Sequence, residues 1–283
     1  MAQVKEIKRH IGSVNKIRQI TKAMYAISLT RVFKSKQQLF QVRAYSQAQL
    51  ELMRDIIGDI RPDNAWLNAP GQGRYVFVVN SDRGLCGRFK GDLNRKADSL
   101  LRQDPDAKLI LGGEKANVYF RQSSYEIAKT YSGVYDKPRY AHAEQIGQEL
   151  MSLYGEHRIP IDLVYMRFIN DFRQVVEVER LLPLSVPPDQ AGEPKKTMTL
   201  YEPSKDAVFE GLVPQYVKVQ LYRILLESKT SEHAIRRQSM RSATDNADEL
   251  IRDLTLLFNK ARQQEITKQL LDIMGGAEAL RQM

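Results

Sequence analysis

Two glycine-bearing loops are the segments of this sequence whose residue types and position could do chemistry. Asn80-Ser-Asp-Arg-Gly-Leu-Cys-Gly87 follows an apolar run and precedes a helical pattern, the place where α/β sheets hold their ligands. Gly112-Gly-Glu-Lys115 stands in the same position after the next apolar run. Neither loop carries the dinucleotide-binding glycine pattern or the Gly-Lys-Ser/Thr of a phosphate-binding loop. We therefore predict two tight strand-to-helix turns in which glycine supplies a positive φ or close packing.

The side chains that could act as nucleophile, base or metal ligand are few and scattered. Cys86 is the only cysteine, which excludes an internal disulfide and suits a reducing compartment. As a nucleophile it would need a histidine base nearby, but none of the four histidines has a recognisable partner spacing for catalysis or metal binding. They are His10, His142, His157 and His233. The sequence predicts no catalytic residue, no cofactor and no metal site.

The elements that position the two loops alternate between strand and helix. Apolar runs predict strands at 75–79, 108–111, 125–129 and 161–166, and amphipathic stretches predict helices at 89–103, 114–122 and 141–157. This alternation predicts a Rossmann-like α/β domain, over residues 74–202, with a mainly parallel sheet. We also expect an added edge strand at 174–180, a loop with Pro187, Pro188 and Gly192–Pro194, and a last strand at 198–201.

Long helices are predicted at both ends of the chain, over about 3–57 and within 204–283. The first segment, 1–57, has an apolar seam with one phase slip near Ile17, through Val4, Ile7, Ile11, Val14, Ile17, Ile20, Met24 and Ile27. The second, 204–283, has a 3-4 alternation through Met240, Ala243, Ala247, Leu250, Leu254, Leu257 and Ala261, and we expect Pro214 to open its helix. Two such seams predict an antiparallel coiled coil.

The net charge of +9 lies entirely in the first fifty residues, which hold ten basic side chains and one acidic side chain. Such a basic helix favours a polyanionic partner: nucleic acid, a membrane surface or an acidic protein surface. The apolar seam, needed for helix pairing, and the absence of bulky aromatic anchors favour the acidic protein surface. No run is long enough to span a bilayer, and no apolar signal core follows the N-terminus.

Five motifs in order along the whole chain resemble the γ subunit of bacterial F-type ATP synthases. They are Ile7-Lys-Arg-His-Ile11, Gln19-Ile-Thr-Lys-Ala-Met24, Ser81-Asp-Arg-Gly-Leu-Cys-Gly87, Ala243-Thr-Asp-Asn-Ala247, and Asn259-Lys-Ala-Arg-Gln263 followed by Ile266-Thr267. The resemblance implies a rotating central stalk that couples proton-driven rotation to ATP synthesis or hydrolysis on an α3β3 head, where the catalytic residues lie on β. It also implies contacts with the ε subunit and the c-ring, and peripheral attachment to the cytoplasmic face of the plasma membrane only through the complex. A coiled-coil nucleic-acid-binding protein remains the alternative.

The same resemblance implies which side chains meet the β subunit. Arg236, Arg262 and Gln263 match positions that contact a β loop, and Thr267 matches a polar position beside them. Lys22 and Met24 match the element near an acidic lever of β. We name Lys16, Arg18 and Lys22 the basic collar and expect it to face that lever. Two departures from the family pattern are Gln269 and Asp272, which stand where glutamates are usual.

Overall fold

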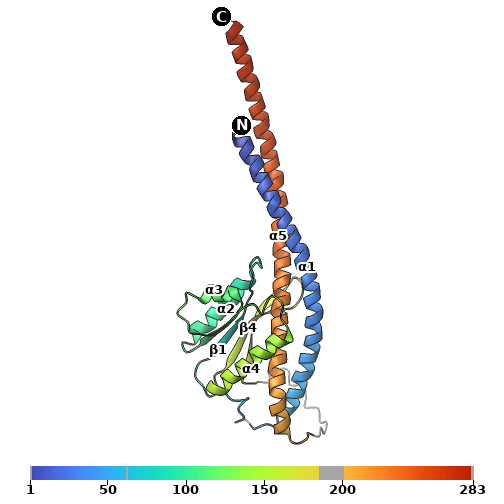
Figure 1. Cartoon of the computed structure of the whole chain (residues 1–283), viewed down its shortest axis with the longest axis vertical. Helices are drawn as coiled ribbons and strands as arrows, with labels where there is room; N and C mark the ends of the chain where they lie inside the picture. Colours follow the sequence, from blue (N-terminus) through green and yellow to red (C-terminus); the bar gives the residue numbers. More distant parts are fainter. Residues whose placement is uncertain (1, 62, 185–200, 282–283) are drawn as a thin grey trace. The chain divides into compact units, whose positions relative to one another are not determined.

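The computed structural model describes residues 2–61, 63–184 and 201–281. The chain divides into two compact units. We call residues 1–27 with 237–283 the helical unit, and residues 28–236 the sheet unit. The two long helices, α1 (Ala2–Ile57) and α5 (Lys205–Arg281), each contribute to both units (Figure 1).

The sheet unit contains a five-stranded sheet in the order β3-β2-β1-β4-β5. Its strands are β1 (Tyr75–Val79), β2 (Lys108–Gly112), β3 (Ile127–Tyr131), β4 (Ile161–Phe168) and β5 (Gln174–Leu182). The first four run parallel, and β5 pairs antiparallel with β4, as expected for the added edge strand. From β1 the chain adds β2 and then β3 on one side of β1, and it then adds β4 on the opposite side. The direction in which strands are added therefore reverses between β1 and β4.

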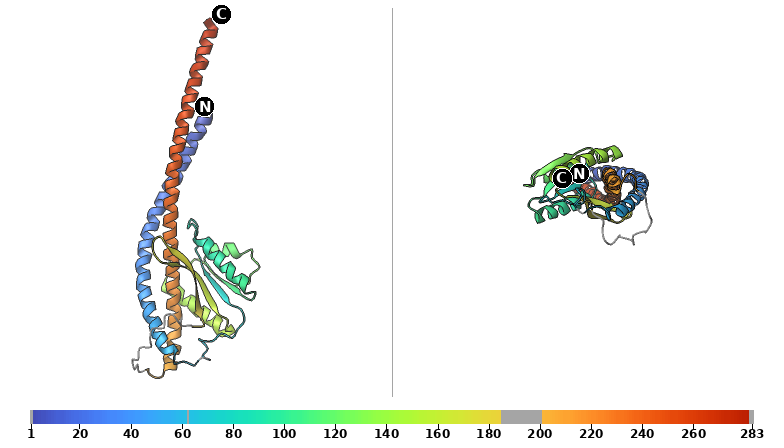
Figure 2. Two further views of the ribbon diagram at one scale, coloured as in Figure 1. Left: turned by 180° about the vertical axis from the view of Figure 1, so that it is seen from behind. Right: turned by 90° about the horizontal axis from the view of Figure 1, so that it is seen from below.

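Helices cover both faces of this sheet (Figures 1 and 2). Val76 and Val78 pack in one core with helices α2 (Phe89–Gln103) and α3 (Glu114–Phe120). Phe77 and its neighbours pack in the other core with α4 (Tyr140–His157) and the sheet-unit parts of α1 and α5. Because β1 is buried on both faces, all five of its residues are apolar.

The predicted fold class, an α/β sheet domain with long antiparallel terminal helices, is confirmed. Helix α2 has the predicted bounds, whereas β3 begins two residues later than predicted. Tyr125 does not belong to the strand because it packs beside α2, where its hydroxyl donates to Asp98 at 2.9 Å. The predicted loop with Pro187, Pro188 and Gly192–Pro194 lies outside the described residues, and so does the predicted last strand, apart from Tyr201.

The predicted start of the C-terminal helix at Pro214 is wrong, because α5 begins at Lys205 and Pro214 lies inside it. Ser204 caps the true start, since its hydroxyl accepts the N–H of Ala207 at 3.2 Å. A proline removes one helical hydrogen bond. The fully buried Phe209 and Val213 anchor the turns before Pro214 in the core and offset that loss.

The two glycine-bearing loops are the predicted tight turns. Gly113 has φ of 87°, and a Cβ there would lie 2.6 Å from the Asn80 carbonyl oxygen. Gly87 and Leu85 also have positive φ. The loops pack against each other, because the N–H of Lys115 donates to the Ser81 carbonyl at 2.9 Å. Cys86 is buried in this arrangement, with its sulfur 3.7 Å from the Ser81 hydroxyl.

Candidate contact surfaces of the long helices

In the helical unit, α1 and α5 lie side by side in opposite directions. Arg18 binds Asp248 at 2.9 Å, while Thr21, further along α1, accepts a hydrogen bond from Thr244, which is earlier in α5, at 2.8 Å. Much of the buried seam on both helices consists of small or polar residues. Its buried members are Ile7, Val14 and Thr21 of α1 and Met240, Ala247 and Ala261 of α5.

The seam of α1 has a different phase from the predicted one. Instead of slipping near Ile17, the buried and half-buried positions continue in strict 3-4 alternation through Arg18, Thr21 and Tyr25. Ile17 and Ile20 therefore lie outside the seam, with 54% and 59% of their surface exposed. The polar Thr21 can be buried because its hydroxyl bonds both Thr244 and the Arg18 carbonyl.

Beyond Ala247, the seam of α5 is also shifted at every second predicted position. Ile251 and Phe258 are half-buried in place of Leu250 and Leu257, while Ala243 and its neighbour Thr244 are both half-buried. Leu250 and Leu257 are 41% and 48% exposed. The helical unit thus buries a seam that mixes apolar residues with small and polar ones, and it also leaves large aliphatic side chains exposed outside the seam.

The basic collar lies on the exposed part of α1. Lys16 and Lys22 are exposed, and Arg18 and Met24 are half-buried. A groove of about 420 Å³ lies between the helices at this level. It is lined by Arg18, Lys22, Tyr25, Arg241, Thr244, Asp245 and Asp248. Arg18 is engaged with Asp248, so the two lysines are the collar's outward-facing charges.

The structure brings together two of the predicted residues near the end of α5. Gln263 and Thr267 line one shallow groove of about 380 Å³, together with Lys260, Gln264, Lys268 and Leu271. Arg262 is exposed on the adjacent side of the helix. Beyond Ala261, α5 also exposes a set of large apolar side chains, 48–69% accessible: Ile266, Leu270, Leu271, Ile273 and Met274.

Arg236 does not share this exposed environment. It is 7% exposed and lies in the sheet unit, where it pairs with Glu232 at 2.6 Å and donates to the Gly84 carbonyl at 3.1 Å. Its guanidinium is therefore used inside the chain. This placement makes Arg236 a support for the loop after β1.

The comparisons with known proteins agree with the motifs. A family model described as ATP synthase matches residues 3–280. Proteins named ATP synthase gamma chain from Moorella thermoacetica and Pelotomaculum thermopropionicum are each 36% identical, over 99% of this chain and 100% of theirs. The chain belongs to the ATP synthase γ-chain family. The resemblance inferred from the motifs is thereby confirmed, and the nucleic-acid alternative gains no support.

Solved structures show the same fold at lower identity. The rotor of Euglena gracilis mitochondrial ATP synthase matches with a TM-score of 0.66 and 19% identity, over 94% of this chain and 99% of that one. The Tetrahymena thermophila central stalk and c-ring structure matches with a TM-score of 0.62 and 20% identity, over 79% and 99%. In the described ranges of this γ-chain family member, no helix combines the length and apolarity needed to cross a bilayer.

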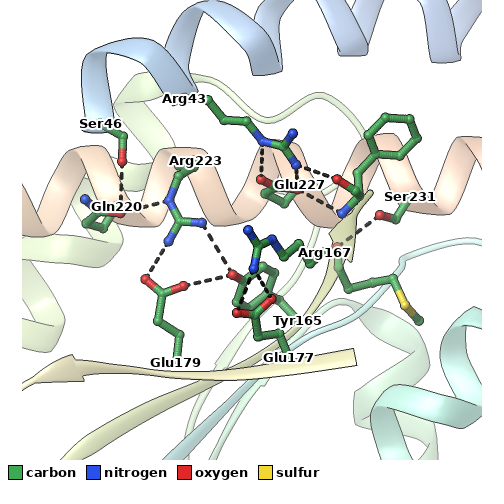
Figure 3. A network of polar contacts seen from close by, with 12 residues as sticks. Arg43, Ser46, Tyr165, Arg167, Glu177, Glu179, Gln220, Arg223, Glu227 and Ser231 are labelled. Carbon is green, nitrogen blue, oxygen red and sulfur yellow. Dashed lines mark hydrogen bonds and ion pairs between the residues drawn. The ribbon is translucent and has the colours of Figure 1, made fainter. Parts of the chain in front are cut away.

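Residues that the sequence did not single out form a polar network between the long helices and the sheet (Figure 3). Arg43 of α1 binds Glu227 of α5 through two hydrogen bonds, at 2.6 and 2.7 Å. Arg223 bonds Gln220 at 2.8 Å, and Gln220 in turn accepts from Ser46 at 3.1 Å. The available sequence signal was the polar run from Glu227 to His233, which interrupts the apolar pattern of a long helix.

Proposed function

We propose that this chain is the rotating central stalk of a proton-translocating F-type ATP synthase. The observation that carries the proposal is the set of large apolar side chains that the helical unit leaves exposed outside its seam. Ile17, Ile20 and Leu256 are more than half exposed, while Thr21 and Ala247 are buried. Contiguous exposed apolar surface marks an interaction site, and a sleeve of surrounding subunits would cover such a helical pair.

The sleeve we propose is the α3β3 head, whose β subunits carry the catalytic sites. A rotating shaft that makes different contacts with each β conformation shifts the population of those conformations, and so their nucleotide affinity. Proton-driven rotation would thus drive synthesis, and hydrolysis would turn the shaft in reverse. We further propose that the ε subunit and the c-ring bind the sheet unit, and that the assembled complex lies on the cytoplasmic face of the plasma membrane.

For the contacts themselves, we propose that the basic collar and Met24 face an acidic segment of β. The exposure of Lys16 and Lys22 supports this role, since like charges gathered on one helix steer an oppositely charged partner. Arg262, Gln263 and Thr267 would meet a second β loop. Arg236 is left out of the contact set because it is buried.

The proposed division of labour follows three segments. The helices in 1–57 and 204–283 form the shaft, and residues 74–202 form the α/β domain that binds the proton-driven part of the machine. This division assigns no cofactor and no active site to the chain, and it places catalysis on the partner subunits.

Reconstitution tests the proposal directly. Mixing the chain with purified α and β subunits of a related bacterial enzyme should give an ATPase complex of 3:3:1 stoichiometry, measured by native mass spectrometry and phosphate release. A chain that hydrolyses ATP by itself at a comparable rate, or that leaves α and β unassembled, would contradict the proposal. DNA binding that survives physiological salt would instead support the nucleic-acid alternative.

A further inference from the structure

Helix α5 is enclosed on all sides over one segment. The thirteen consecutive residues from Ile224 to Arg236 are all buried. A helix buried all round is expected to be apolar all round. Eight of these thirteen side chains are instead polar or charged: Glu227, Ser228, Lys229, Thr230, Ser231, Glu232, His233 and Arg236.

This segment lies in the sheet unit against the carboxyl ends of β1 and β4. The strand order reverses between these two strands, and in open α/β sheets the crevice at such a point is where ligands bind. Ser228 donates to the carbonyl of Val79, the last residue of β1, at 3.0 Å. Ser231 donates to the carbonyl of Met166 in β4, also at 3.0 Å. The chain's own helix therefore occupies the crevice.

Two further side chains of the segment reach main-chain atoms at the same edge. Glu227 accepts the N–H of Phe168, the last residue of β4, at 2.9 Å. Arg236 donates to the Gly84 carbonyl at 3.1 Å. At about 100° per residue, these four side chains point over roughly half of the helix circumference. The helix is thus held by main-chain atoms of β1, β4 and the loop after β1.

Helix α1 closes the other side of the crevice through Arg43. Its guanidinium bonds both carboxylate oxygens of Glu227 and also donates to the Phe168 carbonyl (Figure 3). Glu227 is 1% exposed, so this charge is shielded from water and depends on Arg43. One carboxylate thereby joins α1, α5 and β4.

Such a hydrogen-bonded interface resists rotation of the helix about its own axis, which apolar packing resists poorly. Hydrophobic contacts are non-directional, so a helix with an apolar surface can turn about its axis and exchange one contact for another. Hydrogen bonds lose their strength when the angle at the hydrogen falls. Hydrogen bonds from half of the helix circumference to main-chain atoms of the sheet and the loop after β1 therefore oppose rotation of the helix about its axis.

We propose that residues 224–236 of α5, with Arg43 of α1, form a socket that fixes the roll angle of α5 against the sheet, so that torque passes between the shaft and the α/β domain. This inference rests on the proposed rotor function and assigns positioning residues to it. The crevice that ligands occupy in related sheets is used here as a mechanical joint.

The test uses the assembled enzyme and the double variant Arg43→Gln/Glu227→Gln, which removes both charges but keeps side chains of similar length. The matched control is Lys108→Gln/Glu126→Gln, a solvent-accessible ion pair at 2.8 Å between β2 and the residue before β3 that involves neither long helix. An added Val118→Cys, on the exposed surface of α3, carries a bead, and its angular fluctuation is recorded while the catalytic head is stalled. Membrane vesicles with the same enzymes report protons pumped per ATP hydrolysed.

Because hydrogen bonds to charged groups are stronger than neutral ones, their loss makes local opening roughly tenfold more frequent. We therefore expect angular variance about twofold larger, and fewer protons per ATP, in the socket variant but not in the control. Unchanged variance and unchanged pumping ratio in an assembled socket variant would overturn the inference. If that variant does not assemble, Ser231→Ala, which loses only the bond to Met166, is measured in its place by the same criteria. A wild-type chain that fails to assemble or pump would refute the rotor function itself, so the two failures are distinguishable.

Discussion

His233 makes a pH-dependent contribution to stability that can be calculated from its surroundings. Its side chain is 4% exposed, and burial, followed by the charges of Lys229, Arg236 and Arg31, lowers its pKa from 6.5 to about 2. Two carboxylates lie beside these cations: Glu232 binds Lys229 at 3.0 Å and Arg236 at 2.6 Å, and Asp136 lies 3.8 Å from Lys229. The charges that shift the pKa of His233 are all cationic and disfavour a protonated imidazole.

The sign follows from proton uptake. Below pH 6.5 the unfolded chain protonates at His233 and the folded chain does not, so stability is complete above 6.5 and is lost as the pH falls toward 2. The loss is about 1.4 kcal/mol per pH unit within this window. Between pH 7.5 and pH 5.0 it amounts to about 2 kcal/mol, and this figure is the same for any folded pKa below about 4.

The substitution His233→Gln removes this pH-dependent contribution to the free energy of unfolding, because glutamine has a similar size and does not titrate. Urea unfolding of the full chain at pH 7.5, 6.0 and 5.0 can be followed by the fluorescence of Trp66, which is the only tryptophan and stacks on Tyr154 within the same sheet unit. Relative to wild type, the variant should gain about 2 kcal/mol between the first and last pH. His157→Gln, at an exposed site, controls for the loss of a histidine. Parallel wild-type and His233→Gln profiles would refute the argument.

Three further changes test the contact surfaces, and a fourth tests an ion pair of the sheet unit. Ile20→Ser should cost the isolated chain less than about 0.5 kcal/mol but weaken assembly with the head about fivefold, measured by titration, because its exposed apolar surface is buried only in the complex; equal affinity would count against the sleeve. Arg262→Ala should lower ATP synthesis about tenfold in vesicles while the complex still assembles. Neutralising the basic collar with glutamines should change the ATPase rate and its salt dependence. Unaltered kinetics in either variant would contradict the contact proposed for it. Glu149→Gln should make thermal unfolding less sensitive to pH below 4.5, because hydrogen bonds from Lys129 and Tyr131 lower the pKa of Glu149 and the stability they supply is lost as the pH falls through it; an unchanged slope would contradict that assignment.

Several elements of the sheet unit could be predicted from the sequence because each of them has one dominant local signal. The run Tyr75–Val79 is continuously apolar since both of its faces are covered. Helix α2 has a single apolar face, and its bounds follow from it. The paired glycines mark a turn because Gly113 adopts a conformation that only glycine accepts readily.

The phase of the coiled-coil seam could not be predicted by the same method. Apolar periodicity identifies a face that will be covered, but it does not say by what. In the helical unit Ile17 and Ile20 lie on an exposed face of α1, while the face that meets α5 carries Thr21 beside Ile7 and Val14. A sequence pattern read as one seam was therefore a mixture of the helix-pairing face and the outward face.

The socket escaped prediction for a related reason. Polar residues in a helix usually indicate a solvent-exposed face, so Glu227, Ser228 and Ser231 gave no sign of burial. Their partners are main-chain atoms of strands 59 to 149 residues away, which no local pattern encodes. Only the folded chain reveals that these hydroxyls and this carboxylate are satisfied at the ends of β1 and β4.

The filled crevice also changes how the sheet unit is to be regarded as a receptor. Residues 224–236 occupy the crevice as a bound ligand would. Because they are covalently linked to the same chain, their local concentration is on the order of millimolar or higher. Hydrogen bonds too weak to retain a free peptide are sufficient under that condition. Any small molecule directed at the crevice would have to compete with a helix segment that is covalently linked to the domain and cannot diffuse away.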